Sequence, residues 1–213
     1  MSLGNFISGG GPILIVILAL GALGLLFFFE RLFVILKEKN ELKALSIKVR
    51  NSIAQKNFTA SKQHCRASSS VFSSVMLKAF EYYDNGRISE FEGALQGFVE
   101  DETFKLEKNF RYISMSVAVS PLLGFFGTVI GMVQVFSGIQ QSGGLYGLKG
   151  QASLAQGISV ALYTTVGGLA VAIVLAILIT LLRELEDKLI NKTIEEVRVA
   201  IGKFKNIPAG EVR

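Results

Sequence analysis

Three long apolar stretches without a charged side chain constrain the fold of this chain more than any other feature. They cover residues 12–29, 113–140 and 154–182, and none of them contains Asp, Glu, Lys, Arg or His. A helix needs about 20 apolar residues to cross the roughly 30 Å hydrocarbon core of a bilayer. Lipid offers backbone groups no hydrogen-bond partner, so a helix is the structure that such a stretch adopts. The sequence therefore predicts an all-α membrane protein with three transmembrane helices.

The basic residues predict how the spans are oriented. Of the 22 Lys and Arg residues, none precedes the first span, one is Arg31 directly after its apolar run, thirteen lie in 37–111, one is Lys149, and seven lie from Arg183 onward. Cytoplasmic loops carry the excess of Lys and Arg. The predicted order is an external N-terminus (1–11), a transmembrane helix (12–36), a cytoplasmic helical insertion (37–111), a transmembrane helix (112–140), an external, periplasmic loop (141–153), a transmembrane helix (154–182) and a cytoplasmic C-terminal helix (183–213).

The two polar segments have helical patterns. Apolar positions recur in the insertion at Phe72, Val75, Leu77 and Phe80, and again at Phe91, Leu95 and Phe98, with breaks expected before Val71 and near Asp84–Gly86. The tail should continue the third span as one helix that ends near Pro208 and Gly210. Its apolar residues predict a heptad seam, formed by Leu185, Leu189, Ile190, Ile194, Val197, Ile201 and Phe204. This seam packs either against the chain's own insertion or against other copies of the chain.

Composition argues against several classes of function. Cys65 is the only cysteine and His64 the only histidine, so no disulfide within the chain and no metal site is expected, and we expect the pair to be solvated. No catalytic triad, phosphate-binding loop or cofactor motif occurs, so we expect neither an enzyme nor a bound cofactor. The basic excess lies beside apolar spans without interleaved aromatic residues, which argues against a nucleic-acid partner.

The second and third apolar stretches each carry a strip of small residues on one helical face. Helices in lipid associate through close backbone approach and interhelical hydrogen bonds, which small residues allow. The remaining faces are apolar and suit membrane lipid. The first strip contains Ser120, Gly124, Thr128 and Gly131, flanked by Gly127, and the second contains Ala161, Thr165, Gly168 and Ala172, flanked by Thr164 and Gly167.

The strips allow two interpretations. The glycines and alanines (Gly124, Gly127, Gly131, Ala161, Gly168 and Ala172) suit simple helix packing. The hydroxyls of Thr128, Thr165, Thr164 and Ser120 are candidates to line an ion path. A hydroxyl bonds water but does not hold a proton near neutral pH, and a proton relay needs an ionisable group. If this chain conducts ions, the carboxylate must therefore come from another chain.

The two strips lie in motifs that resemble those of a known family. SPLLGFFGTVIGMVQVF (120–136) and LAQGISVALYTTVGGLAVAI (154–173) are similar to the second-span and third-span motifs of the ExbB/TolQ/MotA ion-driven motor subunits, and the three-span layout resembles ExbB and TolQ most. The resemblance implies a homopentamer in the bacterial inner membrane, with its N-terminus periplasmic and its C-terminus cytoplasmic. The pentamer would enclose the spans of two copies of an ExbD/TolR-like partner, whose aspartate binds the ion near Thr128 and Thr165. Flow of protons or sodium ions would drive rotation and exert force on the cell envelope.

Two positions depart from the family pattern. Val160 stands where many members have glutamate, and Val174 stands where many have proline. The first departure removes a carboxylate from the proposed pore, and the second predicts a less kinked third helix. A non-conducting membrane scaffold is therefore an alternative function. A self-contained channel or transporter is a third, but the spans lack ionisable groups and inverted repeats.

Overall fold

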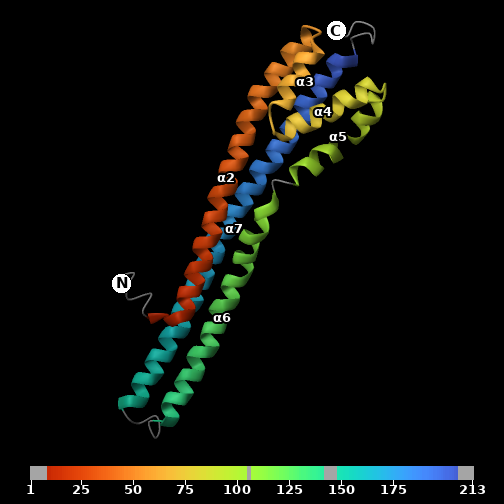
Figure 1. Ribbon diagram of the computed structural model, residues 1–213. Coiled ribbons are helices and arrows are strands. Elements are labelled where there is room, and N and C mark those ends of the chain that lie inside the picture. The colour runs from red at the N-terminus through yellow and green to blue at the C-terminus, as the bar shows by residue number, and fades with distance from the viewer. Residues whose placement is uncertain (1–8, 105–106, 142–147, 206–213) are drawn as a thin grey trace. The chain divides into compact units, whose positions relative to one another are not determined.

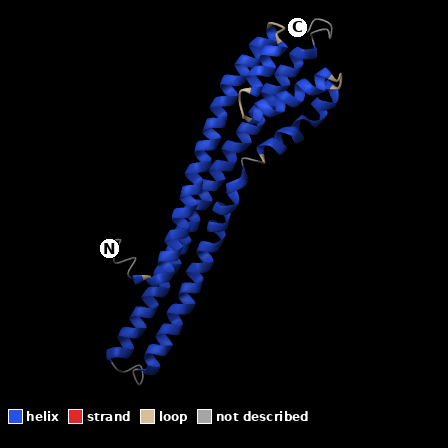
Figure 2. Cartoon of the chain, in the orientation of Figure 1, coloured by secondary structure: helices blue, strands red, loops and turns tan. Residues whose placement is uncertain are grey.

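Most of the chain that its structure describes is helical, with short turns between the helices. The structure is a computed structural model that describes residues 9–104, 107–141 and 148–205. Within these ranges there is no strand (Figure 2), which confirms the all-α prediction. The elements labelled in Figure 1 are α2 (Gly11–Ala54), α3 (Phe58–Arg66), α4 (Val71–Asp84), α5 (Ile88–Thr103), α6 (Phe110–Gln141) and α7 (Leu148–Lys205), with a short 3₁₀ helix, η1 (Glu107–Asn109), before α6.

Three of these helices, α2, α6 and α7, are long and apolar enough to cross a membrane. They contain the three apolar stretches of the sequence. Pro121 lies inside α6, which continues unbroken to Gln141. Most of the predicted N-terminal segment 1–11, the centre of the predicted loop 141–153, and the helix end predicted at Pro208 and Gly210 lie outside the described residues.

The chain forms two compact units. We call the first, residues 1–29 and 109–181, the apolar unit, because it contains the apolar parts of α2, α6 and α7. We call the second, residues 30–108 and 182–213, the basic unit, because it contains most of the Lys and Arg residues.

In the apolar unit, α7 packs against both other helices. Its contact with α2 depends on glycines: a Cβ atom added to Gly21 would lie 3.1 Å from the Val171 side chain, and one added to Gly24 would lie 2.5 Å from that of Leu175. The outer faces of the same helices expose large apolar side chains, among them Leu122, Phe125 and Phe136, which are 66–68% exposed. Exposed apolar surface of this kind suits lipid or further protein.

The basic unit is a helical bundle in which short helices begin and end at local signals. At the start of α4, the Ser70 hydroxyl accepts a hydrogen bond from the Ser73 amide (3.2 Å), and the Glu38 carboxylate on α2 accepts one from the Val71 amide. After Asp84 the chain turns at Gly86, whose φ of +70° suits glycine. Both breaks lie where the sequence predicts them. Phe72, Val75, Phe80, Phe91 and Leu95 are buried, whereas Leu77 and Phe98 are half-buried.

The tail continues the third apolar stretch as a single helix, as predicted, and it buries part of the predicted seam. Leu189, Val197 and Ile201 are buried, whereas Ile190 and Ile194 are only half-buried. In their place, the polar residues Glu186 and Thr193 are buried. The predicted seam is therefore confirmed at Leu189, Val197 and Ile201, whereas Leu185, Ile190 and Ile194 lie at the edge of the buried face. The side chain of Phe204 lies outside the described residues.

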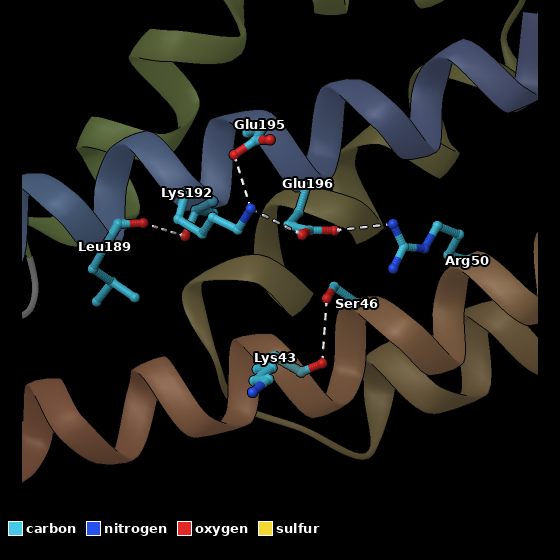
Figure 3. A network of polar contacts seen from close by, with 8 residues as sticks. Lys43, Ser46, Arg50, Leu189, Lys192, Glu195 and Glu196 are labelled. Atoms are coloured by element: carbon cyan, nitrogen blue, oxygen red, sulfur yellow. Dashed lines mark hydrogen bonds and ion pairs between the residues drawn. The ribbon is translucent and has the colours of Figure 1, made fainter.

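Within the basic unit the tail packs against α2, and Figure 3 shows a polar network between them. Lys192 binds Glu195 (2.9 Å) and Glu196 (3.5 Å) on its own helix, and Glu196 reaches Arg50 of α2 at 4.0 Å. These contacts support the interpretation that the tail packs on the chain's own helices. Packing against other copies stays a prediction.

Cys65 departs from the expectation that it is solvated. His64 is exposed, but the Cys65 side chain is completely buried in α3. Burial raises the pKa of the Cys65 thiol to about 12. The sequence expectation was wrong because it could not show which face of α3 is buried in the bundle.

Candidate functional site

The small residues of α6 and α7 bring the two backbones into direct contact. A Cβ atom on Gly124 would lie 3.0 Å from the Thr164 carbonyl oxygen and 3.2 Å from the Thr165 Cα. One on Gly131 would lie only 2.6 Å from the Gly157 carbonyl oxygen. No side chain fits at these two positions without a shift of the opposite helix.

The contact continues toward the other end of the strip. A Cβ atom on Gly168 would lie 2.5 Å from the Ser120 carbonyl oxygen, and one on Gly127 would overlap the Thr164 side chain. Ala161 lies opposite Gly131, and a Cβ atom on that glycine would lie 3.1 Å from its side chain. The structure thus brings together five of the six predicted packing residues. The sixth, Ala172, is buried one turn beyond Gly168.

Two of the four candidate hydroxyl groups lie inside this contact. Ser120 and Thr164 are completely buried. Ser120 donates its hydroxyl hydrogen to the Ser116 carbonyl (2.7 Å), and the Thr164 hydroxyl lies 2.9 Å from the Val160 carbonyl. Their hydroxyl groups therefore bond the backbone of their own helices, behind the surface of the apolar unit.

The other two hydroxyl groups reach the surface of the apolar unit. Thr128 and Thr165 are half-buried. Thr128 donates to the Phe125 carbonyl (2.6 Å), whereas Thr165 lies 3.0 Å from the Ala161 carbonyl and 3.4 Å from that of Gly124 on α6. A hydroxyl oxygen that donates its hydrogen in this way can still accept a hydrogen bond from water, or contact a cation. Thr128 and Thr165 can therefore offer acceptor oxygens to an ion path.

A polar hollow that the sequence reasoning missed lies between α2, α6 and α7 in the same unit. It has a volume of about 400 Å³, and its polar side chains are those of Gln134, Gln156 and Ser159. Val160, at the position where the resemblance leads us to expect a glutamate, lines it as well. The available signal was the presence of Gln134 and Gln156, two polar side chains in otherwise apolar spans. Both are exposed in the structure, so their amides remain free to bond water at the hollow. The hollow offers hydrogen bonds to water but no charge.

The described residues provide no set of acidic, histidine or cysteine side chains arranged to hold a metal ion. The apolar stretches themselves carry no ionisable side chain. What the apolar unit offers is thus a rigid helix pair with uncharged acceptor oxygens on its surface.

Comparison with known proteins agrees with the motifs. Residues 65–195, more than half of the chain, match the MotA/TolQ/ExbB proton channel family. The chain is 29% identical over 99 residues to "Biopolymer transport protein exbB1" of Vibrio cholerae, which covers 46% of this chain and 41% of the relative. It is 30% identical over 123 residues to "Putative biopolymer transport protein ExbB-like 3" of Synechocystis, which covers 56% of this chain and 58% of that relative.

A third relative comes from a further organism. It is the "Putative biopolymer transport protein ExbB homolog" of Methanothermobacter thermautotrophicus, 36% identical over 87 residues, which are 41% of this chain and 29% of the relative. The matches thus span less than two thirds of each of these relatives. The family match covers α4, α5, α6 and most of α7, including both small-residue strips. This protein, a membrane protein with three helical spans, belongs to the MotA/TolQ/ExbB proton channel family.

Proposed function

We propose that this chain is an ExbB/TolQ-like subunit of an energy-transducing motor in the bacterial inner membrane. It couples the flow of protons or sodium ions down their gradient to rotation and to force on the cell envelope. It forms no covalent bond with a substrate, so it is not an enzyme and needs no cofactor.

One observation carries the proposal. α6 and α7 are fixed against each other by backbone contact at Gly124 and Gly131, and the pair presents the hydroxyl oxygens of Thr128 and Thr165 without any ionisable group in the spans. An ion can be passed along hydroxyl oxygens and water, but a proton also needs an acid near the path. The chain therefore acts with a second protein that brings the acid.

The assembly that we propose rests on the resemblance to the family, and the missing acid agrees with it. Five copies of the chain enclose the spans of two copies of an ExbD/TolR-like partner, whose intramembrane aspartate faces Thr128 and Thr165. The exposed apolar faces of the spans contact lipid and neighbouring copies. The N-terminus is periplasmic, and residues 37–111 and 183–213 are cytoplasmic, where their Lys and Arg residues are favoured.

A non-conducting scaffold for an envelope complex is the second candidate. The observation that favours it is the hollow beside Val160, where Gln134, Gln156 and Ser159 supply hydrogen bonds but no carboxylate. A scaffold would keep the α6–α7 contact and the partner, but it would not depend on the threonine hydroxyls.

Threonine-to-valine variants separate the two functions, because valine keeps the shape and removes the hydroxyl. Thr128→Val and Thr165→Val should abolish gradient-dependent activity of the native complex while it still assembles. Thr180→Val is the matched control: Thr180 also lies on α7 and donates to a carbonyl of its own helix, that of Ala176 (2.8 Å), but it is exposed. It lies roughly 22 Å further along the helix than Thr165. Full activity in both test variants would refute the ion path and leave the scaffold.

The stoichiometry has its own test. The tagged chain, isolated from native membranes in mild detergent and weighed by native mass spectrometry, should carry a companion with a single span in a ratio of five to two. Vesicles that contain the purified chain alone should show no saturable cation current, whereas vesicles with the complex should carry one. A current from the chain alone would contradict the requirement for a borrowed acid.

A further inference from the structure

A buried carboxyl group that the proposed ion path does not use lies in the basic unit. Glu186 follows the predicted third span by four residues and is only 5% exposed. Its Oε1 atom receives no hydrogen bond from the residues that the structure describes. A buried carboxylate oxygen without a donor is costly when ionised, whereas burying the neutral, protonated carboxyl costs much less. This site therefore favours the form that holds a proton.

The charged groups around Glu186 come from three elements. Arg31 of α2 is itself buried at 8% exposure and binds its neighbour Glu30 at 3.1 Å. Glu107 of η1 and Asp187 of α7 add negative charge, and Arg183 of α7 adds positive charge. Two positive and two negative groups thus act on the carboxyl. Because their effects largely cancel, they do not offset the free-energy cost of burying the ionised group.

The combined effect is a carboxyl group that titrates near neutral pH. Burial is the largest cause that raises the pKa of Glu186, to about 7, with smaller upward contributions from Glu107 and Asp187. Arg183 and Arg31 act in the opposite direction. A nearby carboxylate on the same helix behaves differently: Glu184 is exposed and binds Lys188 (2.7 Å), which lowers its pKa.

We propose that Glu186, in the basic unit, is a proton-binding site. Its Oε1 atom takes up a proton from the surrounding water and later returns it to water. No other group changes its charge in this step. In the working complex the site holds protons that cross the charge-free spans, and this part rests on the proposed function. The binding of the proton itself does not depend on it.

Infrared difference spectroscopy of the purified full-length chain tests the binding, because the carbonyl band of a protonated carboxyl differs from the band of a carboxylate. The wild-type protein should lose such a band as the pH rises through about 7. Glu186→Gln should lack this transition, whereas Glu184→Gln, the matched control, should keep it. Arg31→Gln should move the midpoint upward, because it removes a positive charge. An unchanged transition in Glu186→Gln, or no neutral transition in the wild type, would overturn the proposal.

The place of the site in the ion path needs a separate measurement. Proton uptake by vesicles that contain the native complex should be slower with Glu186→Gln and unchanged with Glu184→Gln. Equal uptake in both variants, together with the infrared transition, would show that Glu186 binds a proton off the path. Absence of uptake in the wild type would instead count against the motor, while the infrared result would still decide whether Glu186 binds a proton.

Discussion

Gly131 of α6 lies so close to Gly157 of α7 that a single added methyl group would stand 2.6 Å from the Gly157 carbonyl oxygen. Such an overlap with backbone cannot be relieved by rotating a side chain. A larger residue at this position must therefore push the two helices apart, or the protein does not fold. The contact therefore makes a direct prediction about the smallest possible substitution.

Gly131→Ala should destabilise the protein by about 1–3 kcal/mol, the usual cost of overpacking, and Gly131→Leu should also prevent assembly of the complex. Thermal unfolding in detergent and native mass spectrometry measure the two effects. Gly97→Ala is the matched control, since a methyl group at Gly97 in α5 meets no atom within 4 Å. There, alanine should be neutral or stabilising by up to about 1 kcal/mol, because it favours the helix. Equal effects at both glycines would argue against the backbone contact.

Glu38 should stabilise the start of α4. Its carboxylate accepts a hydrogen bond from the Val71 amide, one of the amides that a helix cannot bond internally. Glu38→Ala should cost about 1 kcal/mol of stability, and Glu38→Gln, which keeps an acceptor oxygen, should cost less. Lys39→Ala, at the exposed neighbouring position, is the control. Hydrogen exchange at the first turn of α4 should rise in the alanine variant alone, and a uniform rise would contradict local capping.

Cys65 should react very slowly with maleimides, whichever side of the membrane they are applied to. Its thiol is buried, and a pKa of about 12 leaves almost no thiolate at neutral pH. Labelling should become fast only when denaturant unfolds the basic unit. Resistance of Cys65 to an external reagent therefore does not report topology. Gln63→Cys in a Cys65→Ala background is exposed and should be labelled only after the membrane is permeabilised, if the insertion is cytoplasmic.

The stability of the purified chain should fall as the pH rises from about 4.5 to about 7. The pKa of Glu186 is higher in the folded state (about 7) than its ordinary value of 4.5, so the folded state binds the proton more tightly in this interval. The contribution of Glu186 to the free energy of unfolding is on the order of 3 kcal/mol. It is fully present below pH 4.5 and is lost as the pH rises through about 7. Glu186→Gln should make this slope in thermal melting curves clearly smaller, and Glu184→Gln should not. Part of the slope should remain, because burial also raises the pKa of Glu38. An equal slope in the wild type and in Glu186→Gln would contradict the prediction.

The sequence predicted those features that depend on local pattern. Apolar length predicted three long helices, and the break after Asp84 followed from an Asn–Gly pair that suits a turn. The spacing of Ser120, Gly124 and Gly131 placed them on one face, and in the structure these residues contact α7. In such a stretch the chemistry of each residue and its place on the helix are enough.

The sequence could not predict which polar groups are buried among several helices. Periodicity assigned Ile190 and Ile194 to the core of the tail, but the bundle buries Glu186 and Thr193 instead. The buried thiol of Cys65 was missed for the same reason. The face that a helix buries depends on all the helices packed around it. The spacing of apolar residues along one helix indicates only the face that would contact a single partner.

The glycine contact between α6 and α7 also limits where the protein can change over evolutionary time. Because backbone atoms form that contact, nearly every replacement there enlarges it and is selected against. The outward positions, such as Leu122, Phe125 and Phe136, are largely exposed, so a replacement there need not separate the helices. Descendants of this protein can therefore acquire new companions by altering the outer faces, while the inner pair of helices stays the same.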